Sequence, residues 1–414
     1  RNVLGEKVVS VIHERGPEGE ALAQIFDEVM QRFGTKVLNR WDIDPDADVH
    51  ERAARIAQEM REARVSGSVA VLADPRPAAA IIAGLRKGGV RNRVAGPRTL
   101  ATQAFLDAYR NAWSASGTPA AGLHGTIAST PLLYDTAGEQ AQAFRNDYLK
   151  THQAAPDWVS AAAYEGARLL LHDLVPRGAP QPSAADVQGL RERAHAALAK
   201  PGRAVNGVLG PLAFDAAGAV MPTAYMGSYD GTSLIAALTQ LSPIREENVG
   251  NYLEELVAGR ALYVNDRFMY KTNVVYAGAT IEKISNFDPT AGTADLQLNL
   301  WFRWRGDFAP QDIVFTNAVQ PIKLDKPERQ VQAGDMLYQS YRIKGTFYTN
   351  YSSVERSYGT HVVGVAFRHR TLARNNLMYV SDVLGMNLNS TVSLGRVGKR
   401  SEEHTSELQS HHDL

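Results

Sequence analysis

The stretch VAVLADPRPAAAIIAGLRKGGV, residues 69–90, decides the fold of the first part of the chain. It opens within an unbroken apolar run, Ser68–Ala73, which is short enough to be a buried strand. A helical pattern follows from about Pro77 and ends at Gly88 and Gly89, because glycine commonly closes a helix. A strand that leads directly into a helix is the repeating unit of an α/β fold.

The same unit recurs on both sides of this stretch. Upstream, the strand Lys7–Ile12 precedes a helical pattern over Glu18–Phe33. The strand Lys36–Trp41 then precedes a helix that Asp48 caps, and Asn92–Ala95 is a further strand downstream. Strands that alternate with helices of about 10 to 15 residues predict a parallel sheet with helices on both faces.

The apolar pattern changes near Arg267 from the helical period of about 3.6 residues to the strand period of about 2. Apolar and polar side chains alternate over residues 296–304, and a turn at Asp288–Gly292 separates two such runs. Val363, Val365 and Phe367 form another inward row. This part of the chain is therefore predicted to be all-β, an antiparallel β-sandwich.

The patterns predict four regions. These are an α/β domain over 1–241, a helical linker over 242–265, a β-sandwich over 266–395 and a disordered tail over 396–414. The linker is expected to hold one helix, Asn248–Leu262.

The last residues of the chain have an unusual sequence. Residues 400–410, RSEEHTSELQS, look like the translation of a sequencing adapter, so we expect the tail to be an artefact that packs on nothing. The chain begins at Arg1, with no initiator Met and no signal peptide. We therefore expect a fragment of a longer protein, with any signal peptide and transmembrane segments lying outside it.

The composition excludes several kinds of function. The 414 residues contain 44 basic and 44 acidic side chains, so no net charge gathers nucleic acid. The absence of cysteine excludes disulfides and thiolate sites. Phosphate-loop and nucleophile motifs are missing, and His361 and His369 would lie roughly 26 Å apart on an extended strand. We predict no catalytic residues, no metal and no cofactor.

Several segments of the first region resemble the leucine/isoleucine/valine-binding type of periplasmic solute receptor, a type I periplasmic binding protein. They are residues 7–26, 69–90 and 125–135, the helix at Tyr164–Ala167 and the hairpin at Phe214–Gly218. The resemblance implies an incomplete fold that lacks the first half of lobe 1. Residues 1 to about 120 would then form lobe 2, and 125 to 212 would be poorly supported helices that belong on the absent lobe 1 sheet.

The resemblance also implies a ligand site on lobe 2. The family's first aromatic position falls at Glu18, its second near Leu72–Asp74, and its ammonium-binding carboxylate at Arg98. All three depart from the family pattern. An arginine holds a carboxylate or a phosphate instead of an ammonium group, although Arg98 could equally be a solvated residue at a helix start. We expect Glu18, Asp74 and Arg98 to contact a small ligand that is amino-acid-like or a small carboxylate.

The second region resembles the extracellular β-sandwich of pentameric, Cys-loop-type ligand-gated ion channels. The resemblance rests on Trp304–Asp307, Pro310–Asn317 and Arg342–Asp382, and it implies a sandwich without its last strands. The family's Tyr-Pro-Phe-Asp loop appears here as Arg356–Gly359, which weakens the inference of channel gating. Trp301 is expected to face outward and to contribute to an aromatic box for a ligand.

Together these patterns predict the extracytoplasmic, ligand-sensing region of a membrane-anchored bacterial receptor of the ligand-gated-channel type. The first alternative is a soluble or anchored solute-binding receptor of an ABC transporter. The second is the sensor ectodomain of a signalling enzyme whose output domain is missing. The expected partners are a small-molecule ligand and further copies of the chain, a pentamer if the protein is channel-like. No nucleic acid is expected, and the membrane is reached only through a missing C-terminal segment.

Overall fold

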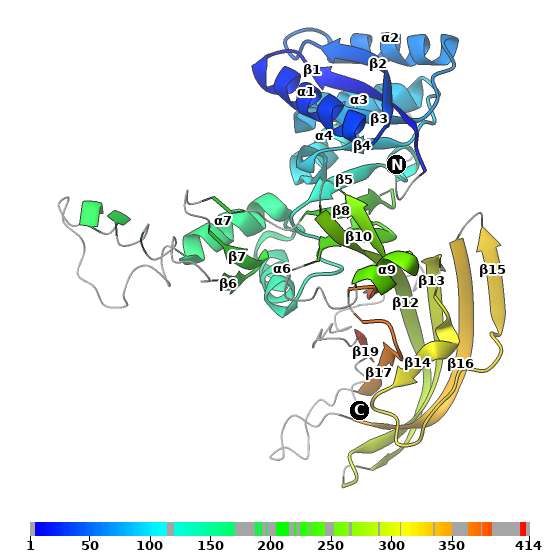
Figure 1. The fold of residues 1–414 in the computed structure, drawn as a ribbon. Helices are drawn as coiled ribbons and strands as arrows, with labels where there is room; N and C mark the ends of the chain where they lie inside the picture. Colours follow the sequence, from blue (N-terminus) through cyan, green and yellow to red (C-terminus); the bar gives the residue numbers. More distant parts are fainter. Residues whose placement is uncertain are drawn as a thin grey trace. The chain divides into compact units, whose positions relative to one another are not determined.

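The structure of the chain is a computed structural model (Figure 1). By its internal contacts it divides into two compact units, Arg1–Ala237 and Leu238–Leu414. The described residues are 5–113, 120–169, 187–189, 191–192, 196, 204–214, 219–220, 224–231, 233–244, 252–264, 267–288, 290–306, 308–333, 336–349, 363–373, 375–382 and 406–410. Among them, no helix is both long enough and apolar enough to cross a membrane.

A seven-stranded sheet organises the first unit. In spatial order its strands are β2 (Lys36–Ile43), β1 (Val8–Glu14), β3 (Ser68–Leu72), β4 (Val94–Gly96), β5 (Ile127–Thr130), β8 (Tyr225–Tyr229) and β9 (Leu234–Ala236). The first five run parallel, whereas β8 and β9 join in antiparallel pairs. The central strands β1 and β3 are almost wholly buried, as their unbroken apolar runs predict.

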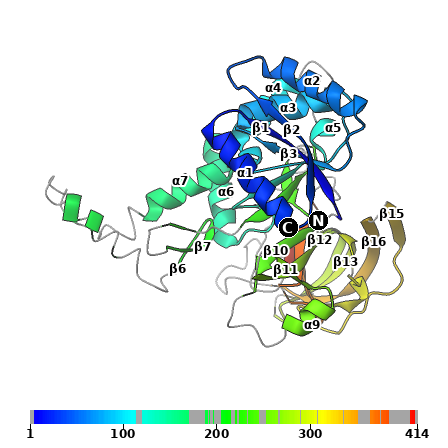
Figure 2. The same cartoon turned by 45° about the horizontal axis from the view of Figure 1, so that its top comes forward.

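Helices cover both faces of this sheet (Figures 1 and 2). On one face, Ala23, Phe26 and Met30 of α1 (Pro17–Arg32) pack against apolar side chains of β1 and β3. On the other face lie α2 (Val49–Glu62), α3 (Pro75–Lys87), α4 (Gln103–Trp113) and the short α5 (Ala120–Leu123). Asp48 caps α2 by accepting the N–H groups of His50 and Glu51, as predicted.

A smaller core joins the remaining elements of the first unit. It combines α6 (Glu139–His152), α7 (Trp158–Arg168) and the hairpin of β6 (Ala204–Gly207) and β7 (Gly210–Ala213). Glu165 of α7 is buried, accepts the N–H of Val208 and pairs with Arg168 at 2.6 Å. A side chain at position 207 would overlap this carboxylate, so the glycine there lets the hairpin approach α7.

The prediction of helices over 125–212 is therefore only partly correct. Ile127–Thr130 is a strand of the large sheet because it pairs with β4 and β8, and Ala204–Ala213 forms the hairpin. Residues 170–186 and 215–218, which include most of the predicted Phe214–Gly218 turn, lie outside the described residues. Phe214 itself pairs with Val220 in an antiparallel bridge.

The second unit is built from β-strands. One sheet contains β10 (Thr239–Pro243), β12 (Arg267–Asp288), β13 (Thr293–Arg305), β16 (Met336–Tyr348) and β15 (Arg329–Ala333), with β11 (Ala261–Val264) and β18 (Leu377–Ser381) also on β12. The other contains β14 (Ile313–Phe315), β17 (Val363–His369) and β19 (Ser406–Ser410). Their pairs are antiparallel except that of β12 with β18.

The two sheets share one core, to which both predicted inward rows contribute. Phe302 of β13 meets Phe367 of β17 edge to face, with ring centroids 5.7 Å apart. Val363 and Val365 join this core from the smaller sheet, and Leu298 joins it from the larger one. The predicted fold class, α/β followed by an antiparallel all-β part, is confirmed by these sheets.

Two expectations about the second unit were wrong. The linker does not hold a helix up to Leu262, because α9 spans only Tyr252–Val257 among the described residues and Ala261–Val264 forms β11. Gly259, with φ of 69°, ends the helical path. The tail was expected to make no contacts, but Ser406–Ser410 pairs with β17. A strand edge offers unpaired backbone groups to any extended segment.

Candidate functional site

The carboxyl ends of the five parallel strands meet at one edge of the first unit's sheet. The strand order β2-β1-β3-β4-β5 changes direction between β1 and β3, and such a point is where doubly wound sheets bind ligands. The chain leaves β1 towards Glu18, β3 towards Asp74 and β4 towards Arg98. The structure thus brings all three residues predicted from the first region to this edge.

At this edge, the charged side chains at the ends of β1 and β2 pair with each other. Arg15, just after β1, donates its Nε–H to Asp42 at 2.8 Å and also pairs with Asp44 at 3.3 Å. The hydrogen bond from Arg15 lowers the pKa of the Asp42 carboxyl and raises the pKa of the Arg15 guanidinium. These side chains are therefore already paired, and a ligand gains little from them.

Asp74 differs because its carboxylate is left free by the local sequence. It is the N-cap residue of α3, yet it makes no capping hydrogen bond through its side chain. Pro77 contributes to this, since proline has no N–H and only the N–H of Arg76 remains for a cap in the first turn. The backbone N–H of Asp74 donates instead to Glu14 at 2.5 Å, which ties the end of β3 to the end of β1.

Arg98 begins the 3₁₀ turn η1 (Arg98–Ala101) and is exposed. Its guanidinium carbon lies 5.2 Å from the ring centroid of Trp158, whose Nε1–H donates to the Arg98 carbonyl at 3.1 Å. Among the described residues, neither Arg98 nor Asp74 forms an ion pair. Thr99 donates to the Ala73 carbonyl at 2.8 Å, so the loops that carry the two charges are joined.

Glu18 lies in the first turn of α1 and is exposed. A carboxylate in this position is favoured by the helix dipole, so its presence needs no ligand. Glu14, Asp157 and Trp158 shape the edge but were missed by the sequence analysis. Glu14 and Trp158 act across more than fifty residues of sequence, and no local pattern marks such contacts.

Trp301 is covered by neighbouring residues instead of exposed, and its proposed ligand contact is not supported. It lies on the predicted face of β13, but its side chain is only 5% exposed. The indole covers Gly278, where a Cβ atom would lie 2.2 Å from the ring, and its Nε1–H donates to Asp382 at 3.2 Å. Trp304 is buried in the core, and Arg356–Gly359 lies outside the described residues.

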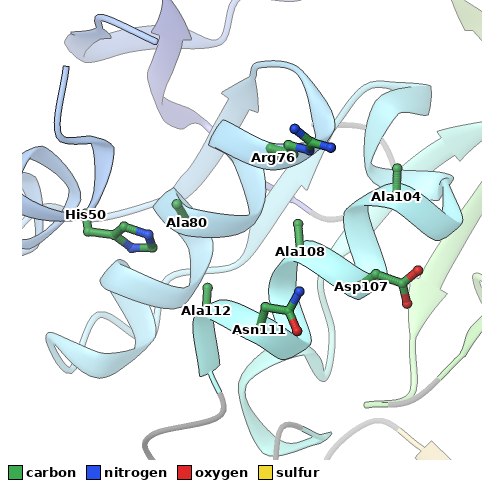
Figure 3. A pocket seen from close by; sticks show the side chains of 8 residues that line it. All are labelled: His50, Arg76, Ala80, Ala104, Asp107, Ala108, Asn111 and Ala112. Carbon is green, nitrogen blue, oxygen red and sulfur yellow. The ribbon is translucent and has the colours of Figure 1, made fainter. Parts of the chain in front are cut away.

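A groove of about 700 Å³ is lined by residues of α2, α3 and α4 in the first unit (Figure 3). Four alanines line it together with His50, Arg76, Asp107 and Asn111. Asp107 is already engaged by Arg110 and by Gln103. The groove contains none of the predicted site residues, and among the described residues no group of three His, Asp or Glu side chains could hold a metal.

Comparison with known proteins gives similarities to solved structures only. No family model and no curated protein matches the chain. The chain is similar to a solute-binding protein of an ABC transporter from R. palustris in complex with benzoate, at 17% identity and a TM-score of 0.46, over 57% of this chain and 59% of that one. It is also similar to the branched-chain amino acid substrate-binding protein LivJ from Streptococcus pneumoniae in complex with isoleucine. The identity is 16% and the TM-score 0.45, over 57% of this chain and 62% of that one.

A third similar structure is a branched-chain amino acid ABC transporter protein from Rhodospirillum rubrum, at 18% identity and a TM-score of 0.42, over 56% of this chain and 61% of that one. The chain thus spans about three fifths of the length of each of these three structures.

Proposed function

We propose that the first unit is a solute-binding lobe that binds a small anionic or zwitterionic ligand at the carboxyl edge of its sheet. One observation carries the proposal: Arg98 and Asp74, which form no ion pair with any residue that the structure describes, follow neighbouring strands at this edge. Arg98 would hold a carboxylate or phosphate of the ligand, and Asp74 an ammonium group if the ligand has one. This function needs no catalytic residue and no cofactor.

The setting of the two charges supports binding over a structural role. Charged side chains that stabilise a fold are usually paired, as Arg15 is with Asp42 in the same unit. Doubly wound sheets bind ligands at the carboxyl ends of their strands, next to the point where the strand order reverses. This function corresponds to the solute-binding receptor of an ABC transporter, in an extracytoplasmic compartment.

Titration calorimetry of the full chain tests the proposal, with benzoate, succinate and leucine as probes. Arg98→Ala should cost about 1.5 to 3 kcal/mol of the affinity for the anionic probes, the range for a hydrogen bond to a charged group. Arg91→Ala is the matched control, because Arg91 is an exposed arginine just before β4, at the opposite edge of the sheet. Tight leucine binding that Arg98→Ala leaves unchanged would contradict the proposal.

The second unit favours a second candidate function, a receptor with an output beyond solute binding. Residues 238–414 form a separate compact unit with its own aromatic core, which the solute-binding lobe does not need. Such a unit could transmit binding to a membrane partner, either a channel pore or a signalling enzyme. Oligomeric assembly, as a pentamer for a channel, would accompany it. Analytical ultracentrifugation of the full chain tests this: a chain that stays monomeric at all concentrations would argue against the channel form.

A further inference from the structure

Trp158 contacts both the backbone and the side chain of Arg98. Its Nε1–H donates to the Arg98 carbonyl at 3.1 Å, and its ring lies beneath the guanidinium, 5.2 Å from Cζ to the ring centroid. An exposed arginine normally samples many rotamers, whereas a guanidinium over an aromatic face is held by cation–π attraction. The Trp158 indole therefore holds both the backbone carbonyl and the guanidinium group of Arg98 in place.

Trp158 is itself held firmly. Its side chain packs against the main core of the first unit and also against the smaller core around α6 and α7. The preceding Asp157 accepts the backbone N–H of Gln103 at 3.0 Å through Oδ2 and that of Ser160 at 2.9 Å through Oδ1. One carboxylate thus joins the first turns of α4 and α7, and the indole follows directly from it.

We propose that Trp158 is a positioning residue for Arg98, and that the pair makes the site select a planar carboxylate bound edge-on to the guanidinium. This inference rests on the proposed function and narrows the ligand class. The guanidinium carbon lies over the indole ring, and among the described residues no carboxylate pairs with the guanidinium N–H groups. A carboxylate has two acceptor oxygens in one plane, which match two parallel N–H groups of such a fork. A neutral amide has one acceptor and no charge, so the same arrangement discriminates against it.

The test uses the full chain labelled with ¹⁵N and a pair of probes, benzoate and benzamide. The chain has five tryptophans and therefore five indole N–H signals, and Trp158→Phe identifies the one that belongs to Trp158. Benzoate should shift that signal and the Arg98 Nε–H signal in a saturable way. Benzamide at the same concentrations should shift neither.

Two variants separate positioning from simple support of the fold. Trp158→Ala should weaken benzoate binding about two- to fivefold, the effect of an exposed cation–π contact, and should reduce the preference for benzoate over benzamide. Trp158→Phe keeps an aromatic face and should restore most of the benzoate affinity and most of the preference for benzoate. Trp41→Phe is the control, since Trp41 is a half-buried tryptophan whose Nε1–H donates to Glu59, away from Arg98.

The possible results distinguish this inference from the proposed function. If benzoate perturbs neither Arg98 nor Trp158, the proposed site is wrong and the inference falls with it. If benzoate binds through Arg98 but Trp158→Ala, still folded by its thermal unfolding, keeps both the affinity and the benzoate preference, only the inference is overturned. The expected result is that Trp158→Ala loses part of the affinity and of the preference for benzoate, and that Trp158→Phe recovers most of both quantities.

Discussion

The first unit leaves one aspartate and one arginine at the ends of neighbouring strands without a shared ion pair, whereas the second unit pairs an aspartate after β18 with an arginine of β13. Asp382 is buried, lies 2.6 Å from Arg303 and also accepts the N–H of Trp301. In the described part of the first unit, Asp74 and Arg98 form no ion pair, and both are exposed. The same residue types are therefore arranged differently: a closed network in one unit and, in the other, exposed groups that we propose to bind a ligand.

Local chain geometry explains this difference. Asp382 follows the buried end of β18, and its own N–H is bound by Ala277, so its carboxylate turns onto the outer face of β13. Arg303 reaches it from β13 and also lies over the ring of Tyr276, 4.8 Å from Cζ to the centroid. Asp74, in contrast, makes no capping hydrogen bond through its side chain, and Pro77 lacks one of the N–H groups that a cap would use. Arg98 lies over an indole instead of pairing with a carboxylate.

Removing the buried carboxylate should have the largest effect. Asp382→Ala leaves Arg303 without its partner and the Trp301 N–H without an acceptor, so the second unit should lose about 3 kcal/mol of unfolding free energy. Denaturant unfolding monitored by tryptophan fluorescence measures it. Asp42→Ala removes an exposed pair in the first unit and should cost less than about 1 kcal/mol. Equal effects of the two substitutions would break the comparison.

A buried carboxylate in the first unit should behave like Asp382. Glu165→Ala removes the acceptor of the Val208 N–H and the carboxylate that pairs with Arg168, which should destabilise α7 and the β6–β7 hairpin by about 2 kcal/mol. Hydrogen exchange of the α7 amides reports this local loss. Unchanged protection of these amides would mean that the carboxylate does not hold the hairpin.

The sequence revealed the fold more fully than the site. Unbroken apolar runs and alternating rows predicted the parallel sheet and the aromatic core, because burial follows directly from such periods. The position of Asp74 and Arg98 at strand ends was also accessible from the order of elements. The burial of Trp301 was not, since it depends on Gly278 and Asp382, which lie far away in the sequence. The contact between Trp158 and Arg98 spans sixty residues and left no local signal.

A double-mutant cycle should show that proline keeps Asp74 free. In the natural chain, Asp74→Ala should leave the unfolding free energy almost unchanged, because the side chain caps nothing. Pro77→Ala supplies a helix N–H, so in that background Asp74→Ala should cost about 1 kcal/mol, the usual value of an N-cap. Chemical denaturation of the four proteins gives the coupling. An equal cost of Asp74→Ala in both backgrounds would show that proline is not the reason.

The smallest expected effect concerns a buried imidazole, His369. Its Nδ1 accepts the N–H of Leu372 at 2.9 Å, and burial lowers the pKa of its imidazole, with Asp312 and Arg370 as charged neighbours. As the pH falls, the imidazole of His369 is therefore protonated in the unfolded chain at a higher pH than in the folded one. The contribution of His369 to stability is complete above pH of about 6.5 and is lost as the pH falls below it. Thermal unfolding between pH 5 and 8 of the natural chain and of His369→Gln measures the difference, and identical pH profiles would contradict this assignment.

The central claim is that the first unit binds a carboxylate at the edge that carries Arg98 and Asp74. The most direct measurement is a crystal structure of the full chain with 4-bromobenzoate, in which anomalous scattering locates the bromine. We expect one bromine site beside Arg98, with the carboxylate against the guanidinium edge, and we expect this site to disappear in Arg98→Ala. Bromine in the groove lined by His50 and Arg76, with nothing beside Arg98, would contradict it.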